Sequence, residues 1–289
     1  MTTASPDSPT VLQMRRPAGT FILLAALTAP CPLLAGEQGV SAEITLAPSV
    51  QAQILPHAAE MRPIRPLLKF EAGSEIERSF GHKSQGDLRF EVVYLENGLI
   101  GWTVNAVFRP RESHLSRHVL SLCGLVPLVV ESSYKPPASR KDVPISELFL
   151  PLGIKPTDQY IFQTRIVSLA SNARSICDPA PGSEFTFQYE HERVLSKSGN
   201  DGQGDATVST AQVTTSKFVC KVGGSLEKPH PKLQGEILEV SCDIESGDGK
   251  MSSAKYAFLR ESSYYLPLET RSNGERTQYQ YIDFNYARP

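Results

Sequence analysis

Apolar and polar residues alternate in short runs over much of the chain, which is the pattern of strands with one buried face. The clearest runs are residues 88–95 and 99–108, which lie on either side of Asn97-Gly98. Because Asn-Gly accepts the positive φ angles of a type I′ turn, these two runs predict a β-hairpin.

The turn also predicts which residues of this hairpin face each other. In the register of a two-residue loop, Val93 pairs with Trp102. Leu95 then pairs with Ile100. Both pairs are apolar, so one face of the hairpin should pack on the core.

Similar runs recur in the second half of the chain. Residues 184–194 place Phe185, Phe187 and Tyr189 on one face of a strand. A second Asn-Gly pair, at residues 273–274, predicts another type I′ hairpin. Further strands are expected at residues 125–130, 159–169, 208–222, 235–244, 253–259, 264–271 and 275–286.

Helices are expected to be few and short. Residues 145–150 are the best short-helix candidate, and residues 111–123 fit either a helix or a strand. Residues 37–70 hold four prolines and are expected to form an extended lead-in with one or two edge strands. The pattern as a whole predicts a mainly β fold, an antiparallel sandwich or barrel-like sheets, with at most one or two short helices.

The clearest break between predicted strands is the sequence Cys-Asp-Pro-Ala-Pro-Gly at residues 177–182. Two prolines and a glycine within six residues are typical of a loop between structural units. We therefore expect a β-rich N-terminal domain over residues 37–178 and a β-rich C-terminal domain over residues 179–289.

Residues 1–36 have the pattern of a secretory signal peptide. Two arginines at positions 15 and 16 precede an apolar run at residues 21–29, and small residues follow at Ala35-Gly36, where cleavage is expected. The apolar run is too short for a membrane-spanning helix, and no other stretch is long enough. Cys31 could instead be a lipid-attachment cysteine, although Pro30 departs from the usual pattern before such a residue.

Cleavage would remove Cys31 and leave four of the five cysteines, an even number that suggests two disulfides in an exported protein. Three pairings are possible. We favour Cys123–Cys177 and Cys220–Cys242, because these pairings close small loops. Closing about 54 and 22 residues stabilises the fold by at most about 4.2 and 3.4 kcal/mol.

Charge and motifs exclude several classes of function. The net charge of −2 does not suit a protein that holds nucleic acid by a broad basic surface. The chain lacks a G-x-S-x-G elbow, a phosphate-binding loop and a dinucleotide fingerprint. No cofactor is expected.

Two groups of residues are weak candidates for a site. His114 and His118 are four residues apart and would share one face of a helix, where they could bind a metal with Glu112 nearby, although the sequence offers no obvious third ligand. The C-terminal tyrosines could form a stacking platform for a ligand, although they also suit a sheet surface. These tyrosines are Tyr264, Tyr265, Tyr279 and Tyr281.

Residues 218–268 include the segments Phe-Val-Cys-Lys-Val, His-Pro-Lys-Leu-Gln-Gly-Glu and Tyr-Tyr-Leu-Pro-Leu. The C-terminal region of about 70 residues around them resembles a group of uncharacterised exported β-rich proteins of Gram-negative bacteria. The resemblance implies no activity. It supports the Cys220–Cys242 pairing and a β-rich C-terminal domain.

The sequence therefore predicts a bacterial periplasmic or envelope protein without enzymatic activity. It would bind a protein or cell-surface partner through loops or a sheet edge. The alternative is a periplasmic hydrolase or metal-dependent enzyme whose residues form no recognisable motif. A third hypothesis, an inhibitor of an envelope-acting toxin, rests only on size and location.

Overall fold

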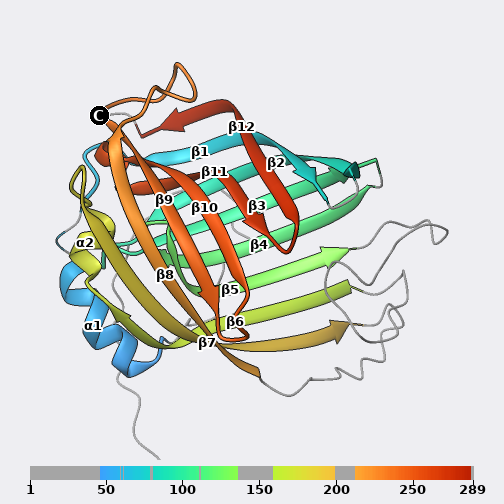
Figure 1. The fold of residues 1–289 in the computed structure, drawn as a ribbon, viewed down its shortest axis with the longest axis horizontal. Helices are drawn as coiled ribbons and strands as arrows, with labels where there is room; N and C mark the ends of the chain where they lie inside the picture. The colour runs from blue at the N-terminus through green and yellow to red at the C-terminus, as the bar shows by residue number, and fades with distance from the viewer. Residues whose placement is uncertain are drawn as a thin grey trace, which may run out of the picture. The chain divides into compact units, whose positions relative to one another are not determined.

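The computed structural model describes residues 46–58, 60, 62–78, 81–110, 112–135, 159–198 and 212–287. Its twelve strands follow one another in antiparallel order and close into a barrel, in which β1 pairs with both β2 and β12 (Figure 1). The first six strands are β1 (Leu67–Glu77), β2 (Lys83–Tyr94), β3 (Ile100–Arg109), β4 (Ser113–Leu122), β5 (Val126–Lys135) and β6 (Gln159–Ser171). The others are β7 (Glu184–Ser198), β8 (Gln212–Ser225), β9 (Ile237–Ser246), β10 (Met251–Leu259), β11 (Tyr264–Ser272) and β12 (Glu275–Tyr286).

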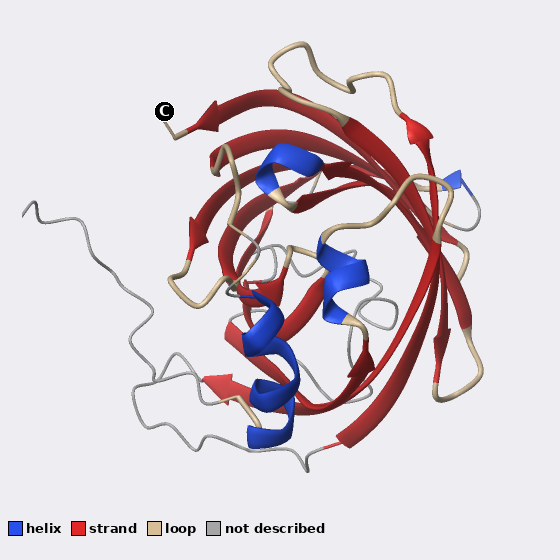
Figure 2. Ribbon diagram, turned by 90° about the vertical axis from the view of Figure 1, so that its left-hand side faces the viewer, coloured by secondary structure: helices blue, strands red, loops and turns tan. Residues whose placement is uncertain are grey.

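The predicted fold class is confirmed, and of its two forms the barrel is the one observed. Two short α-helices accompany the described strands, α1 (Pro48–Ala58) and α2 (Ala173–Cys177). Figure 2 looks onto the end of the barrel where both helices lie. The expected signal peptide at residues 1–36, Cys31 and the helix expected at residues 145–150 lie outside the described residues.

Side chains alternate between the interior and the outer face of the barrel. On β1, Phe70 and Ala72 are buried inside while Glu71 is exposed outside. The register carries this alternation across the sheet: Phe70 pairs with Phe90 of β2, which pairs with Val104 of β3. All three are buried, so the period-two pattern of the sequence records the inner and outer faces of one sheet.

The first predicted hairpin forms, but its register differs by one residue from the prediction. Val92, not Val93, pairs with Trp102, and Tyr94 pairs with Ile100. The loop has three residues, because the Leu95 N–H donates to the carbonyl of Leu99. Gly98 takes the left-handed conformation at the third loop position, with a φ of 79°. A three-residue loop of this kind moves every pairing by one, which leaves Val93 exposed.

The second Asn-Gly hairpin has the predicted two-residue loop. Ser272 pairs with Glu275 across Asn273 and Gly274, whose φ angles are 50° and 76°. The segment at residues 111–123, which fitted a helix or a strand, forms β4. The same dipeptide therefore supports two loop lengths, and the flanking strands decide between them.

The extended lead-in expected over residues 37–70 is wrong for residues 48–58, which form α1. Pro48 is its first residue, where a missing N–H breaks no helical hydrogen bond. Val50, Ile54 and Ala58 recur at four-residue spacing and are fully buried in the core. Their burial outweighs the hydrogen bond that Pro56 removes near the end of the helix.

The strands β10 and β11 divide the apolar interior into two clusters. Leu259, Tyr264 and Leu266 face a cluster formed with β1, β2, β3 and β12. Phe258 and Tyr265, from the same two strands, face a cluster formed with α1, α2 and β5–β9. Both faces of this part of the sheet are buried, because β11 pairs with β12 only from Glu269 onward.

Strands from both expected domains belong to this barrel. The boundary expected after Asp178 lies one residue beyond the end of α2, and the strands on its two sides, β6 and β7, are paired along their length. Residues 44–289 form one compact unit.

Candidate ligand-binding interior

The barrel interior has two halves with different chemistry. The half next to α1 and α2, which we call the closed half, is filled by buried apolar side chains, Ile54, Leu128 and Phe187 among them. The opposite half, which we call the polar half, contains tyrosines, a histidine and arginines on strands β4, β7, β10 and β12. Its inward-facing residues are Arg117, Ser132, Tyr189, His191, Arg193, Tyr256 and Tyr279.

Arg117 is the central residue of the polar half. Its neighbours Leu115 and Val119 on β4 share its inward face, and its register partners are Val104 and Ser132. The Nε of Arg117 donates to the Oγ of Ser132 at 3.0 Å. Burial lowers the pKa of Arg117, nearby Tyr279 raises it, and the like charge of Arg193 lowers it. The protein therefore holds this cation in surroundings that disfavour it.

Three inward-facing tyrosines lie in the polar half, and of these Tyr279 is close enough to Arg117 to shift its pKa. Burial raises the pKa of Tyr279, which the positive charge of Arg117 partly opposes. Burial also raises the pKa of Tyr189 to about 12, and it raises that of Tyr256. All three phenols are half-buried, although they point into the barrel. They are neutral at neutral pH and can donate hydrogen bonds to a ligand.

His191 lies beside Tyr189 on the same inward face of β7, with ring centroids 5.6 Å apart. Burial lowers the pKa of His191, and the charge of Arg193 lowers it further. The ring is therefore neutral at neutral pH. Its Nδ1 is buried without a hydrogen-bond partner among the described residues, as are Trp102 Nε1 and Ser74 Oγ. Since buried polar atoms normally have partners, these three atoms are available to a ligand.

Carboxylates are scarce among the described inward-facing positions of the barrel. Among the described inward-facing strand positions, a carboxylate occurs at Glu275, at the rim, where it pairs with Arg78 at 3.2 Å. No carboxylate of the described residues forms an ion pair with Arg117. A buried cation without a carboxylate favours the binding of an anion.

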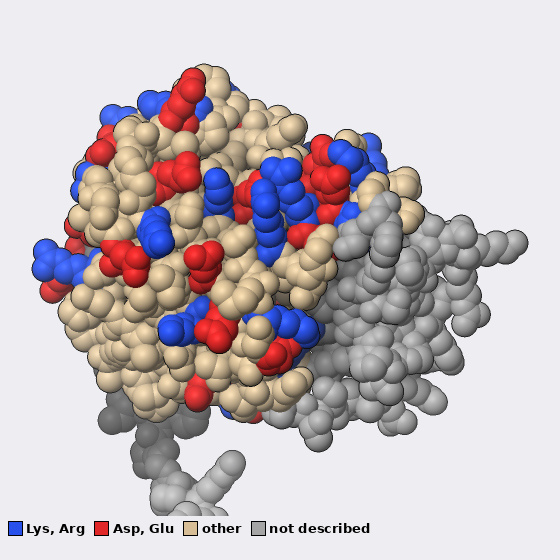
Figure 3. All heavy atoms as spheres, viewed as in Figure 1, with Lys and Arg blue, Asp and Glu red and all other residues tan. Residues whose placement is uncertain are grey.

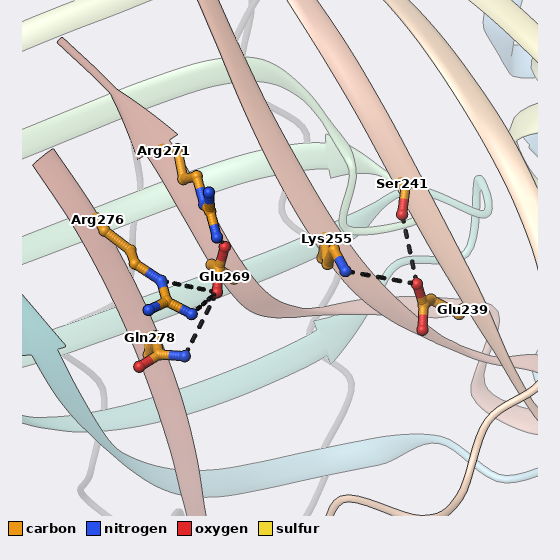
Figure 4. Close-up of polar contacts among 7 residues, drawn as sticks. All are labelled: Glu239, Ser241, Lys255, Glu269, Arg271, Arg276 and Gln278. Carbon is orange, nitrogen blue, oxygen red and sulfur yellow. Dashed lines mark hydrogen bonds and ion pairs between the residues drawn. The ribbon is translucent and has the colours of Figure 1, made fainter. Parts of the chain in front are cut away.

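The outer face of the barrel shows the opposite arrangement, with acidic and basic side chains interspersed (Figure 3). Outward-facing charges pair across strands, as Lys69 does with Glu91 and Arg165 with Glu192. In Figure 4, Glu269 accepts from Arg271 and Arg276 on the outer surface. The outside is therefore nearly neutral locally, whereas the described inner positions are basic.

A hollow of about 460 Å³ lies at the rim of the polar half, between the β9–β10 and β11–β12 hairpins. Asp243, Arg271 and Arg276 line it together with serines, so its charge is mixed. Paired, solvated charges of both signs give it no preference for a ligand class. The inward-facing residues around Arg117 are better suited to recognition because they are less solvated.

The two candidate histidines lie on β4 and not on a helix, so they face the outside of the barrel. His118 Nδ1 is 3.0 Å from Thr103 Oγ1, and His114 Nε2 is 3.6 Å from Glu112. Four residues along a strand span about 13 Å, whereas ligands lie about 2 Å from a zinc ion. One ion cannot bind both rings, and no group of three metal-ligating side chains occurs among the described residues.

Three of the four candidate tyrosines are core residues. Tyr264 and Tyr265 are 3% and 1% exposed, and Tyr265 donates to the carbonyl of Ile176 at 2.6 Å. Tyr281 is 9% exposed and donates to the carbonyl of Pro267. They cannot stack on an external ligand. Tyr279 alone faces the polar half, beside Arg117.

The cysteines form the two disulfides that the loop-size argument favours. Cys123 joins Cys177, which ties the β4–β5 turn to α2. Cys220 and Cys242 face each other across β8 and β9, with Cα atoms 4.0 Å apart. All four are buried in the closed half. Two disulfides are typical of an exported protein.

Arg117 did not emerge from the sequence as a candidate. The signal was present, since Leu115, Arg117 and Val119 share one face of a strand. An arginine between two apolar residues on an inward face is a buried charge, but this inference required β4 to be recognised as a strand.

None of the described helices is long and apolar enough to span a membrane. No protein-family model matches the chain, and no curated protein is significantly similar to it. A solved structure of YmcC, a hypothetical lipoprotein of Escherichia coli, is 7% identical, with a TM-score of 0.33. The match covers 73% of this chain and 86% of that chain. A likeness this weak supports no conclusion about this protein, whose function must be argued from its own residues.

Proposed function

We propose that this protein is an exported, non-enzymatic binding protein that holds a small ligand inside the polar half of its barrel. The observation that carries the proposal is the set of half-buried inward-facing tyrosines, histidine and arginines around Arg117. Apolar side chains fill the interior positions of the closed half. Polar side chains with unpaired donors suit a ligand site better than a core.

Export is supported by the signal-peptide pattern of residues 1–36 and by the two disulfides. Cleavage near Ala35-Gly36 places the mature protein in the periplasm or outside the cell. Mass spectrometry of the protein isolated from cells tests this directly. We expect an N-terminus near Gly36 and no free thiols, whereas an intact residue 1 or reduced cysteines would contradict export.

A partner that adds a strand to a free sheet edge, as the sequence suggested, does not suit this architecture. The twelve described strands form a closed sheet, so each has a neighbour on both sides. The hydrolase alternative needs a nucleophile with its base, or two carboxylates that face a common space. The polar half instead offers guanidinium, phenol and imidazole groups, which favours binding over hydrolysis.

Trp102 makes the proposal testable, because it is the chain's single tryptophan and faces the interior between Val92 and Val119. The experiment titrates the oxidised mature protein with N-phenylnaphthylamine, an uncharged dye that fluoresces in apolar surroundings. We expect saturable binding with energy transfer from Trp102. Binding without saturation, or no binding, would contradict a ligand site inside the barrel.

Two variants on β12 provide a matched control. Thr277 faces inward, opposite Ile76 and Thr270, whereas Gln280 faces outward and is exposed. Thr277→Phe should weaken dye binding by about tenfold or more, since it fills interior space. Gln280→Phe should leave the affinity unchanged. Equal effects of the two substitutions would place the dye on the outer surface and overturn the proposal.

A further inference from the structure

Arg117 carries more information about the ligand than the other inward-facing residues do. Its Nε is committed to Ser132, and the rest of its guanidinium has no carboxylate partner among the described residues. Arg193, on β7, is close enough to lower the pKa of Arg117 by repulsion. This repulsion adds to the cost of burying Arg117, and an anion that contacts Arg117 would offset both.

Planar guanidinium groups bind carboxylate, sulfate and phosphate oxygens with paired hydrogen bonds. The donors that could complete the coordination of such an oxygen also lie on inward-facing positions. They are the phenol of Tyr279, which is close enough to Arg117 for each to shift the other's pKa, and the unpaired His191 Nδ1. The site can therefore satisfy an anionic headgroup without a metal ion.

The walls beside these donors are apolar. Trp102 of β3 is half-buried and packs against the buried ring of Phe90 on β2, with ring centroids 6.1 Å apart. Leu115 and Ile244 face inward on β4 and β9, and both are half-buried. A free inorganic anion would leave this apolar surface in contact with water, whereas a ligand with an apolar tail would cover it.

We propose that the ligand is a single-chain anionic amphiphile whose headgroup binds Arg117 and whose tail lies against the aromatic and aliphatic wall that includes Trp102. This inference rests on the proposed interior site and names its ligand class. Carboxylate, sulfate and phosphate headgroups share the required chemistry.

The experiment measures displacement of N-phenylnaphthylamine by a set of probes with one tail and different headgroups, all kept as monomers. The probes are dodecanoate, dodecyl phosphate, dodecanol and dodecyltrimethylammonium, with inorganic phosphate as a headgroup without a tail. We expect both anionic amphiphiles to displace the dye at concentrations about tenfold or more below those of the neutral and cationic probes. Inorganic phosphate should displace it poorly.

Arginine variants assign this preference to one residue. In Arg117→Met, dodecanoate should displace the dye only at the concentration that dodecanol needs. Arg117→Lys should keep part of the advantage of dodecanoate, since lysine retains the charge but not the paired hydrogen bonds. Arg89→Met is the matched control, because Arg89 is an outward-facing arginine whose side chain is 79% exposed. Arg89→Met should leave the preference for dodecanoate over dodecanol unchanged. Retained dye binding shows that each variant is folded.

The outcomes separate this inference from the proposed function. If the dye binds inside the barrel but dodecanoate and dodecanol compete equally, the anionic preference is wrong and the interior site stands. If Arg117→Met still binds dodecanoate better than dodecanol, Arg117 is not the residue that causes the preference. If inorganic phosphate competes as well as dodecyl phosphate does, the ligand is not an amphiphile. If the dye does not bind, the proposed function itself fails.

Discussion

The closed half and the polar half of the barrel are built on the same alternation of inward and outward side chains, but they bury different groups. In the closed half, α1 and α2 pack on the sheet, both disulfides are buried, and the inward side chains are aliphatic or aromatic. In the polar half, inward side chains bear charge and unpaired donors. A protein under selection for stability alone would fill both halves with apolar residues. The difference indicates that the polar half is kept for a ligand, at a cost in stability.

The largest predicted effect tests whether the closed half supplies most of the stability. Ile54 of α1 is fully buried, so Ile54→Ala should lower the free energy of unfolding by about 2–5 kcal/mol. Ile244 is an inward isoleucine at the edge of the polar half and is half-buried. Ile244→Ala should therefore lower the free energy of unfolding by less than Ile54→Ala does. Urea unfolding of the two oxidised variants makes the comparison, and equal losses would mean that the halves do not differ in packing.

The second prediction has the opposite sign. Because Arg117 is a half-buried cation with no carboxylate partner among the described residues, Arg117→Met should raise the free energy of unfolding of the ligand-free protein by about 1 kcal/mol. If Arg117 stabilised the fold, its replacement by methionine would lower the free energy of unfolding instead. Urea unfolding without added amphiphile decides between these results, and a loss above about 1 kcal/mol would assign Arg117 a structural role.

The third prediction concerns pH and His191. Burial, and then Arg193, hold the pKa of His191 below its ordinary value of 6.5, so the unfolded chain binds more protons below that pH. The free energy of unfolding should therefore fall as pH decreases below about 6.5, by about 1 kcal/mol or less from this residue. His191→Gln should flatten that part of the profile. If His191→Gln leaves the slope between about pH 7 and pH 5 unchanged, His191 is solvated rather than buried.

The smallest predicted effect lies on the outer face. Arg276, and then Arg271, lower the pKa of Glu269 through hydrogen bonds, so this carboxylate stabilises the fold above about pH 4.5 and ceases to do so as pH falls through its lowered pKa. Glu269→Gln should cost about 0.5 kcal/mol at neutral pH, since its two arginine partners are exposed to solvent. Thermal unfolding of the variant and the parent protein at low and high salt measures this loss of stability. If Glu269→Gln lowered the free energy of unfolding as much as Ile54→Ala does, charges on the outer face would matter as much to stability as the core, which contradicts this account.

Much of the fold follows from local patterns in the sequence. Two Asn-Gly pairs located two hairpins, and the alternation at residues 184–194 located β7 with Phe187 inside. The register of the first hairpin was missed, because a three-residue loop with Gly98 in the left-handed conformation follows the same dipeptide. Helix α1 was missed because its prolines suggested extended structure, while the packing of Ile54 that stabilises it is a long-range effect.

The candidate site was harder to predict than the fold. Arg117 of β4 and Tyr279 of β12 are about 160 residues apart in sequence, yet in the barrel they are close enough to shift each other's pKa. The candidates drawn from spacing, His114 and His118, share an outer strand face and no common ligand space. Of the four candidate tyrosines, only Tyr279 reaches the polar half. Tyr281 shares its inward face on β12 but is 9% exposed and packs in an apolar cluster. Long-range pairing of strands is information that a single sequence does not display.

The most direct test of an anion site at Arg117 is a crystal structure of the oxidised protein with a terminally brominated dodecanoate. The bromine locates the tail by its anomalous scattering, and the carboxylate locates the headgroup. We predict the carboxylate within about 3 Å of the Arg117 guanidinium, with the tail inside the barrel beside Trp102. A carboxylate bound at the rim hollow or on the outer face, with the polar half unchanged, would contradict this site.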